Sequence, residues 1–180
     1  HQAHIILYYA GTSNDVWAQY TALTAVAGAL VPWGAVTVVN EAAHTSLPLV
    51  VLRDPEVLAD YIGFIESLPL LLLFCGLVKY EVAGTSGVWM RTFGAEYFGL
   101  PNFAALATGH DEGQRYSDIF ENVLFYLYDT GAQMVVGNTM QIGENEFFRL
   151  RAPSAAEYFL QDEAPLLVAD IIGADEINVE

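Results

Sequence analysis

Basic residues are scarce in this chain. Its 180 residues include six Lys and Arg against 22 Asp and Glu, which gives a formal net charge of −16. A field of this sign repels phosphate backbones and anionic lipid headgroups, so the composition disfavours binding to nucleic acid or to a membrane. The same charge attracts a basic protein partner, although an acidic surface can also serve only to keep an apolar chain in solution.

Cysteine is almost absent as well. Cys75 is the single thiol, and it lies in the apolar run from Leu68 to Val78. One thiol cannot form an internal disulfide, and this fits the reducing cytoplasm, where a thiol in an apolar run usually packs in the core. The run is far shorter than the roughly 20 residues that a membrane-spanning helix needs. Because the chain begins at His1 and not at methionine, we expect a processed protein or a fragment of a longer one.

Recognisable catalytic and cofactor motifs are also missing. No Gly-x-Ser-x-Gly sequence marks a nucleophile, and residues 84–87 lack the lysine and the helix of a phosphate loop, so they predict a hairpin turn. His44 and His110 stand beside acids without the spacing of zinc ligands. Acid pairs such as Glu144 and Glu146 arise by chance among 22 acids. The sequence therefore favours a protein without cofactor, metal ion or enzymatic activity.

The first part of the chain predicts a strand, a helix and a second strand. Residues 4–10 are apolar, β-branched and aromatic, which is typical of a buried strand. Ser13 or Asn14 is positioned to cap an amphipathic helix that ends near residues 32–34. Residues 35–39 predict the second strand, parallel to the first because a helix connects them.

The middle of the chain predicts a helix and a hairpin. Asp54 and Pro55 form a helix start, with Asp as the cap and Pro in the first turn. Residues 70–82 are apolar and then alternate, which predicts a central strand. Residues 88–93 return as its hairpin partner.

The last part predicts a long helix and two closing strands. Apolar residues recur at helical spacing from Tyr116 to Leu127, and Gly131 has the position of a C-terminal cap. Residues 146–151 and 166–172 predict strands, and residues 173–180 form an acidic tail. Residues 1–180 are thus expected to form a single α+β domain. We predict a mixed β-sheet with about three helices, a ferredoxin-like βαβ theme with an additional helix.

Two glycine-marked turns flank the long helix and form the candidate site. If the fold returns both turns to one edge of the sheet, their polar side chains lie near one another. The site then includes Glu96 with Gly99, Leu100 and Pro101 at the first turn, and Gly137, Asn138 and Thr139 at the second.

Two arginines extend this candidate site. Arg149 and Arg151 are two residues apart on a predicted strand and so face the same side. They are able to bind a carboxylate ligand, or to form ion pairs with Glu96 and Glu146, and the ion pairs are the favoured interpretation.

Short motifs spread over the chain resemble the bacterial domain-of-unknown-function family 4261. They are the opening residues 1–6, the Phe98-Gly99-Leu100-Pro101-Asn102 turn, the Gly137-Asn138-Thr139 turn and residues 148–151. The resemblance implies a shared fold but no activity, because the family has none established. Asn102 and Asn138 stand where the family usually has acids, so a role that needs a carboxylate at either turn is not expected here.

Charge and the lack of catalytic motifs lead to one functional hypothesis and two alternatives. The leading hypothesis is a non-enzymatic, acidic protein-interaction module of the bacterial cytoplasm, of the adaptor or immunity-protein type, which binds a basic partner or associates with itself. The first alternative is an enzyme or small-ligand binder that uses a cleft between the two turns. The second is a structural subunit of an assembly.

Overall fold

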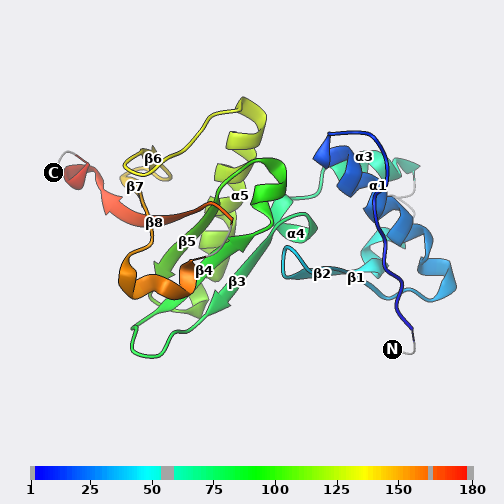
Figure 1. Ribbon diagram of the computed structural model, residues 1–180, viewed down its shortest axis with the longest axis horizontal. Coiled ribbons are helices and arrows are strands. Elements are labelled where there is room, and N and C mark those ends of the chain that lie inside the picture. The colour runs from blue at the N-terminus through cyan, green and yellow to red at the C-terminus, as the bar shows by residue number, and fades with distance from the viewer. Residues whose placement is uncertain (1–2, 54–58, 162–163, 178–180) are drawn as a thin grey trace.

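The computed structural model describes residues 3–53, 59–161 and 164–177, which form two lobes along the long axis of the molecule (Figure 1). We call residues 3–53 and 59–66 the N-terminal lobe. Residues 70–161 and 164–177 form the sheet lobe. Among the described residues no helix has the length and hydropathy to cross a membrane.

The N-terminal lobe consists of helices and one small hairpin. The first predicted helix is present, but it is not amphipathic, and its cap is Asp15 and not Ser13 or Asn14: the Asp15 carboxylate accepts a hydrogen bond from the Ala18 N–H at 3.1 Å. The elements are α1 (Val16–Ala29), η1 (Val31–Trp33), β1 (Thr37–Asn40), β2 (Thr45–Pro48), η2 (Leu49–Arg53) and α3 (Tyr61–Glu66). The helix start predicted at Asp54 and Pro55 lies outside the described residues.

The predicted parallel strand–helix–strand unit is wrong. Residues 4–10 form no strand and are mostly exposed, and β1 pairs in antiparallel fashion with β2 in a separate two-stranded sheet. β-branched and aromatic residues favour a strand only where a neighbouring strand supplies hydrogen bonds and packing. Nothing in the described residues supplies that neighbour to residues 4–10.

The sheet lobe confirms the α+β class. Its sheet has the order β3-β4-β5-β8-β7-β6, in which β5 and β8 are parallel and the other neighbours antiparallel. The ferredoxin-like theme and the helix count were therefore not exact. The elements are α4 (Leu70–Leu73), β3 (Gly76–Tyr80), β4 (Val88–Phe93), η3 (Ala95–Phe98), β5 (Asn102–Ala107), η4 (His110–Glu112), α5 (Gly113–Thr130), β6 (Thr139–Gln141), β7 (Glu146–Arg151), η5 (Ala155–Leu160), β8 (Leu166–Gly173) and η6 (Ala174–Glu176).

Helix α5 covers one face of this sheet, as the apolar spacing predicted. Its Phe120 lies 5.9 Å from Phe103 of β5 and 5.8 Å from Phe148 of β7, measured between ring centres. Gly131 ends the helix in the left-handed conformation (φ 67°), as expected of a C-terminal cap. The β3–β4 hairpin and strands β7 and β8 are likewise confirmed, whereas β5 and β6 were not predicted.

The leucine run that predicted a strand begins instead as the short helix α4. Glu121 of α5 accepts hydrogen bonds from the backbone N–H groups of Leu70 and Leu71, both at 2.8 Å. These donors would otherwise have no partner in the first turn of a helix. A carboxylate from a distant element thus favours the helical turn, and the strand begins only at Gly76.

The lobes share part of the main core and side-chain hydrogen bonds from Asn40 and Thr45 to α4 and Phe74, and two further features join them. The first is an aromatic cluster in which Trp17 of α1 stacks on Tyr128 of α5 at 5.3 Å and packs edge-on against Phe74 at 5.4 Å. The second is Ala43 in the β1–β2 loop, which is fully buried against the backbone of Gly76 and next to Gly94. A Cβ atom at Gly76 would lie 2.0 Å from the Ala43 carbonyl oxygen, so only glycine permits this approach.

The predicted acidic tail is ordered as far as Ile177. Strand β8 continues to Gly173, and η6 follows it. The Gly173 N–H donates to the Glu176 carboxylate at 2.9 Å, and Arg149 donates to the Glu176 carbonyl oxygen. These contacts tie the segment to β7.

Candidate functional site

The first predicted turn is held by a buried asparagine. Asn102 is only 1% exposed, and its side-chain N–H donates to the Glu96 carboxylate at 2.7 Å. Its carbonyl oxygen accepts from the Ala95 N–H at 3.3 Å. An aspartate at this position has no donor for Glu96 and adds a second negative charge beside it. Asn102 therefore shapes the turn, and Glu96 is occupied in holding it.

The second predicted turn is also closed by its own asparagine. The Asn138 side-chain oxygen accepts from the Val135 N–H at 3.0 Å, and the Leu150 N–H donates to the Asn138 carbonyl at 2.9 Å. Gly137 has φ of 90°, a left-handed conformation that favours glycine. Thr139 is exposed at the start of β6.

The structure does not bring the two turns together. The first turn, with Gly99, Leu100 and Pro101, leads into β5, and the second leads into β6. Strands β8 and β7 lie between β5 and β6 in the sheet. Both strands begin at the same edge of the sheet, but β7 and β8 separate the two turns there, so the turns are not neighbours.

The two candidate arginines lie on one side of β7, and both are bound within the chain. Arg151 donates to Glu157 at 2.7 Å from each terminal nitrogen and to Asp170 at 2.8 Å. Arg149 donates to the Glu176 carbonyl oxygen. The expected partners were wrong: Glu146 pairs with Arg115 at 2.6 Å, and Glu96 with Asn102. Arg151 thus anchors η5 to the sheet.

This anchor changes the titration of Glu157. The hydrogen bonds from Arg151 lower the pKa of Glu157 to about 2, and the Ser154 N–H contributes in the same direction. The two carboxylates raise the pKa of Arg151 above its ordinary value. Only 15% of the Glu157 side chain is exposed, so the pair is well shielded.

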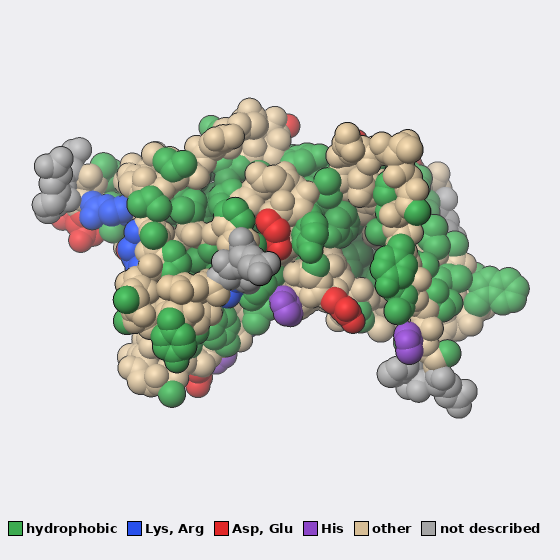
Figure 2. Space-filling model, in the orientation of Figure 1, with side chains coloured by type: hydrophobic (Ala, Val, Ile, Leu, Met, Phe, Trp, Pro, Cys, Tyr) green, Lys and Arg blue, Asp and Glu red, His purple; other side chains and the backbone are tan. Residues whose placement is uncertain are grey.

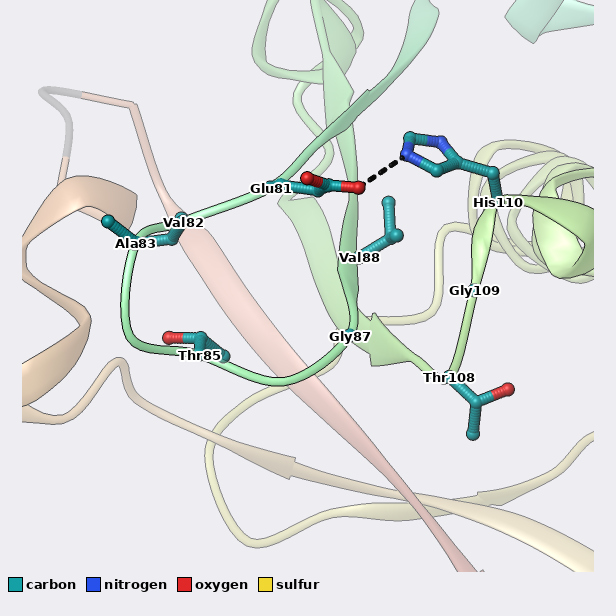
Figure 3. A pocket seen from close by; sticks show the side chains of 9 residues that line it. All are labelled: Glu81, Val82, Ala83, Thr85, Gly87, Val88, Thr108, Gly109 and His110. Carbon is teal, nitrogen blue, oxygen red and sulfur yellow. Dashed lines mark hydrogen bonds and ion pairs between the residues drawn. The ribbon is translucent and has the colours of Figure 1, made fainter.

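A shallow hollow of about 380 Å³ lies between the β3–β4 loop and the turn from β5 to α5 (Figure 3). Glu81 and His110 point toward each other across it, with 3.2 Å between Oε1 and Nε2. Both side chains are more than half exposed. The Thr108 N–H and hydroxyl are already bound by Glu112, so the hollow offers one exposed polar pair and little else to orient a ligand.

The remaining reactive residues occupy structural positions. Burial raises the pKa of the Cys75 thiol to about 12, which keeps it protonated and unreactive. His44 has a left-handed backbone (φ 52°) and packs its ring edge on Phe93 at 4.5 Å. Within residues 3–53, 59–161 and 164–177, no group of three or more His, Cys, Asp and Glu side chains is placed to hold a metal ion.

The most unusual surface is apolar and lies on the N-terminal lobe. More than half of the exposed large hydrophobic side chains among the described residues belong to this lobe, although it is the smaller one. Lys and Arg side chains appear only on the opposite, left-hand part of the molecule in Figure 2. We call this set the apolar surface; its members are Ile5, Ile6, Tyr8, Tyr9, Val26, Trp33, Val36, Val39, Val50, Val51 and Ile62.

Sequence reasoning assigned residues 4–10 to a buried strand and did not identify the other members of this surface as exposed. One signal did distinguish them. Between residues 3 and 52 the only Asp, Glu, Lys or Arg residues are Asp15 and Glu41, so this part of the chain has few charges to place outside. Helix α1 shows the result, since Ala18, Ala22 and Val26 lie exposed along its outer side.

The described residues form an α+β protein whose six-stranded mixed sheet carries α5 on one face. Residues 91–167 match the family described as Domain of unknown function (DUF4261), which confirms the resemblance. The matched part runs from within β4 to the start of β8. The N-terminal lobe lies outside the match. No curated protein and no solved structure matches the chain.

Proposed function

We propose that the protein is a non-enzymatic interaction module that binds other protein chains through the apolar surface of its N-terminal lobe. The observation that carries this proposal is the large number of exposed apolar side chains on the N-terminal lobe, most of them within residues 3–52, where Asp15 and Glu41 are the only Asp, Glu, Lys or Arg. Exposed apolar side chains in this number are costly in water, and they mark protein contact sites where they lie side by side. Trp33, which is 87% exposed, belongs to the residue type most often found at the energetic centre of an interface.

The sheet lobe supports the proposal through its charge. Most of the acids of the chain lie in this lobe, where they set the sign of the electrostatic field. Such a field steers a partner with basic residues toward the molecule, while the apolar surface supplies the contact. An adaptor or immunity-type protein of the bacterial cytoplasm fits this division, and the single buried cysteine agrees with a reducing compartment.

Capture at native expression level tests the proposal with two matched double variants. Trp33→Ser with Val50→Ser removes two members of the apolar surface, whereas Val135→Ser with Val136→Ser removes two exposed valines of the sheet lobe. We expect partners recovered with the wild type to be lost with the first variant and kept with the second, as read by quantitative mass spectrometry. Equal recovery with both variants, or no enriched chain with any of them, contradicts the proposal.

A further inference from the structure

Residues 4–10 are a strand-forming segment without a strand partner. In the described part of the chain, no backbone hydrogen bond reaches residues 3–10. Ile6 is 64% exposed and Tyr8 is 81% exposed, although side chains of this kind are typical of strand interiors. A row of free N–H and C=O groups beside apolar side chains is a template for pairing with another strand.

The segment is nevertheless held in place by one side chain. Leu7 packs on the small core of the N-terminal lobe, formed by Ala27, Val31, Leu49 and Leu52. The segment runs uncoiled along the lobe (Figure 1), so alternate side chains fall on opposite sides. Ile6 and Tyr8 therefore share the side away from Leu7, and the backbone edges stay accessible.

A second copy of the chain fits this segment. When two such segments run antiparallel about Leu7, Ile6 of one copy lies opposite Tyr8 of the partner subunit, and Ile5 lies opposite Tyr9 of the partner subunit. Both are pairs of a β-branched with an aromatic residue, a combination that stabilises neighbouring antiparallel strands. The pairing is the same for both copies, as a two-fold interface requires.

Charge also allows this contact. Two copies with a net charge of −16 each repel one another overall. The repulsion is weaker between the N-terminal lobes, because this lobe contains four acids, Asp15, Glu41, Asp60 and Glu66, and one base, Arg53, whereas most of the acids lie in the sheet lobe. Contact through residues 4–10 keeps the acid-rich sheet lobes apart, at the outer ends of the pair.

We propose that residues 4–10 of two copies pair as antiparallel strands about a two-fold axis at Leu7 and so form a homodimer. The proposal rests on the proposed function and extends it: a second copy of this chain pairs at residues 4–10, and other partners bind the rest of the apolar surface, which includes Trp33 and Val50. It also explains why a segment with strong strand propensity lies exposed in the single chain.

The first test is the mass of the 180-residue protein over a range of concentrations, by light scattering or sedimentation. Ile6→Lys places a charge opposite Tyr8 of the partner subunit, whereas Val136→Lys makes the same charge change on the sheet lobe at a residue of similar exposure, 57%. We expect Ile6→Lys to weaken the dimer roughly tenfold or more and Val136→Lys to leave it unchanged. Both sites are exposed, so circular dichroism should show folded chains.

Cross-linking tests the register. The double variant Ile6→Cys/Tyr8→Cys keeps Leu7 and places each new thiol opposite a thiol of the second copy, where a disulfide is able to form, whereas Tyr9→Cys places the two thiols about four strand positions apart. We expect the first variant alone to form disulfide-linked dimers upon oxidation, because Cys75 is buried with a raised pKa.

A wild type that stays monomeric at every concentration overturns the proposal, as does equal weakening by the two lysines or equal cross-linking of the two cysteine variants. The proposed function fails separately. If the chain is monomeric yet still captures partners that depend on Trp33 and Val50, only the homodimer is wrong.

Discussion

The two lobes differ in how they divide apolar and charged residues between inside and outside. In the sheet lobe, α5 buries apolar side chains on one side and exposes mainly polar side chains on the other. Acids and arginines form ion pairs at the surface of this lobe. In the N-terminal lobe, α1 is apolar or small on nearly every side, and apolar residues remain exposed. An apolar helix is normally enclosed by its own domain or by a partner. This contrast between the lobes is the basis for the proposal that the N-terminal lobe binds other chains.

The largest effect on this arrangement should come from Gly76→Ala, which breaks the contact between the lobes. The new Cβ atom would meet the Ala43 carbonyl oxygen at 2.0 Å, and backbone atoms cannot move aside cheaply. We expect a loss of about 3 kcal/mol or more in the free energy of unfolding, measured by denaturant titration. Gly143→Ala is the control, since its Cβ atom meets first the flexible end of Glu146, and a similar loss there would contradict the explanation.

Two tryptophans allow a comparison between an apolar side chain packed between the lobes, Trp17, and one exposed on the apolar surface, Trp33. Trp17→Ala removes the ring that contacts Phe74 and Tyr128, and we expect it to cost about 3 kcal/mol. Trp33→Ala removes a ring that is almost fully exposed, and we expect a change within about 0.5 kcal/mol in the monomer. Thermal unfolding at low protein concentration measures both, and equal losses would show that Trp33 is packed in solution.

A smaller effect should appear in the sheet lobe when Glu157→Gln removes the carboxylate bound by Arg151. The folded-state pKa of Glu157 is lowered to about 2, so its stabilisation is complete above the unfolded-state pKa of about 4.3 and is lost as the pH falls toward 2. After allowance for solvent screening we expect about 1–2 kcal/mol at neutral pH. Wild type and variant should converge in stability between about pH 4 and pH 2, whereas the exposed Glu144→Gln should leave this pH dependence unchanged.

The smallest effect should be that of salt on self-association. Contact through residues 4–10, which contain no Asp, Glu, Lys or Arg, does not weaken when electrostatic fields are screened, and the repulsion between the acidic sheet lobes decreases. We expect the dimer fraction to stay constant or rise slightly between about 0.05 and about 0.5 M NaCl, as measured by sedimentation. A dimer that dissociates as salt increases would show instead that ion pairs hold the two copies together.

Sequence patterns predicted the sheet lobe better than the N-terminal lobe. Helix α5, its glycine cap and strands β7 and β8 follow from spacing alone, because their apolar faces meet a core within the same chain. Strand propensity misled at residues 4–10, where no neighbouring strand is present, and at Leu70 and Leu71, where Glu121 stabilises a helical turn from 50 residues away or more. Such long-range partners leave no local pattern.

Prediction of the candidate site was limited for the same reason, because it depended on partners far away in the sequence. The two turns were identified correctly as turns, but their positions in the sheet depend on β5 and β6, which carried no recognised strand signal. Arg149 and Arg151 were placed on one side of a strand, while their partners on η6, η5 and β8 depend on the fold. The shortage of charge between residues 3 and 52 was visible in the sequence and pointed to the apolar surface most directly.

The buried Ala43 also has a mechanical consequence. Its contacts are with backbone atoms at close range, and attraction of this kind declines by a quarter to a half over a gap of about 0.5–1 Å. A force that separates the lobes is therefore opposed by the Ala43 contact over small displacements, and the contact is lost once the lobes have moved apart by a short distance. A force applied to a partner bound at residues 4–10 would pass through the β1–β2 loop directly to β3 and β4.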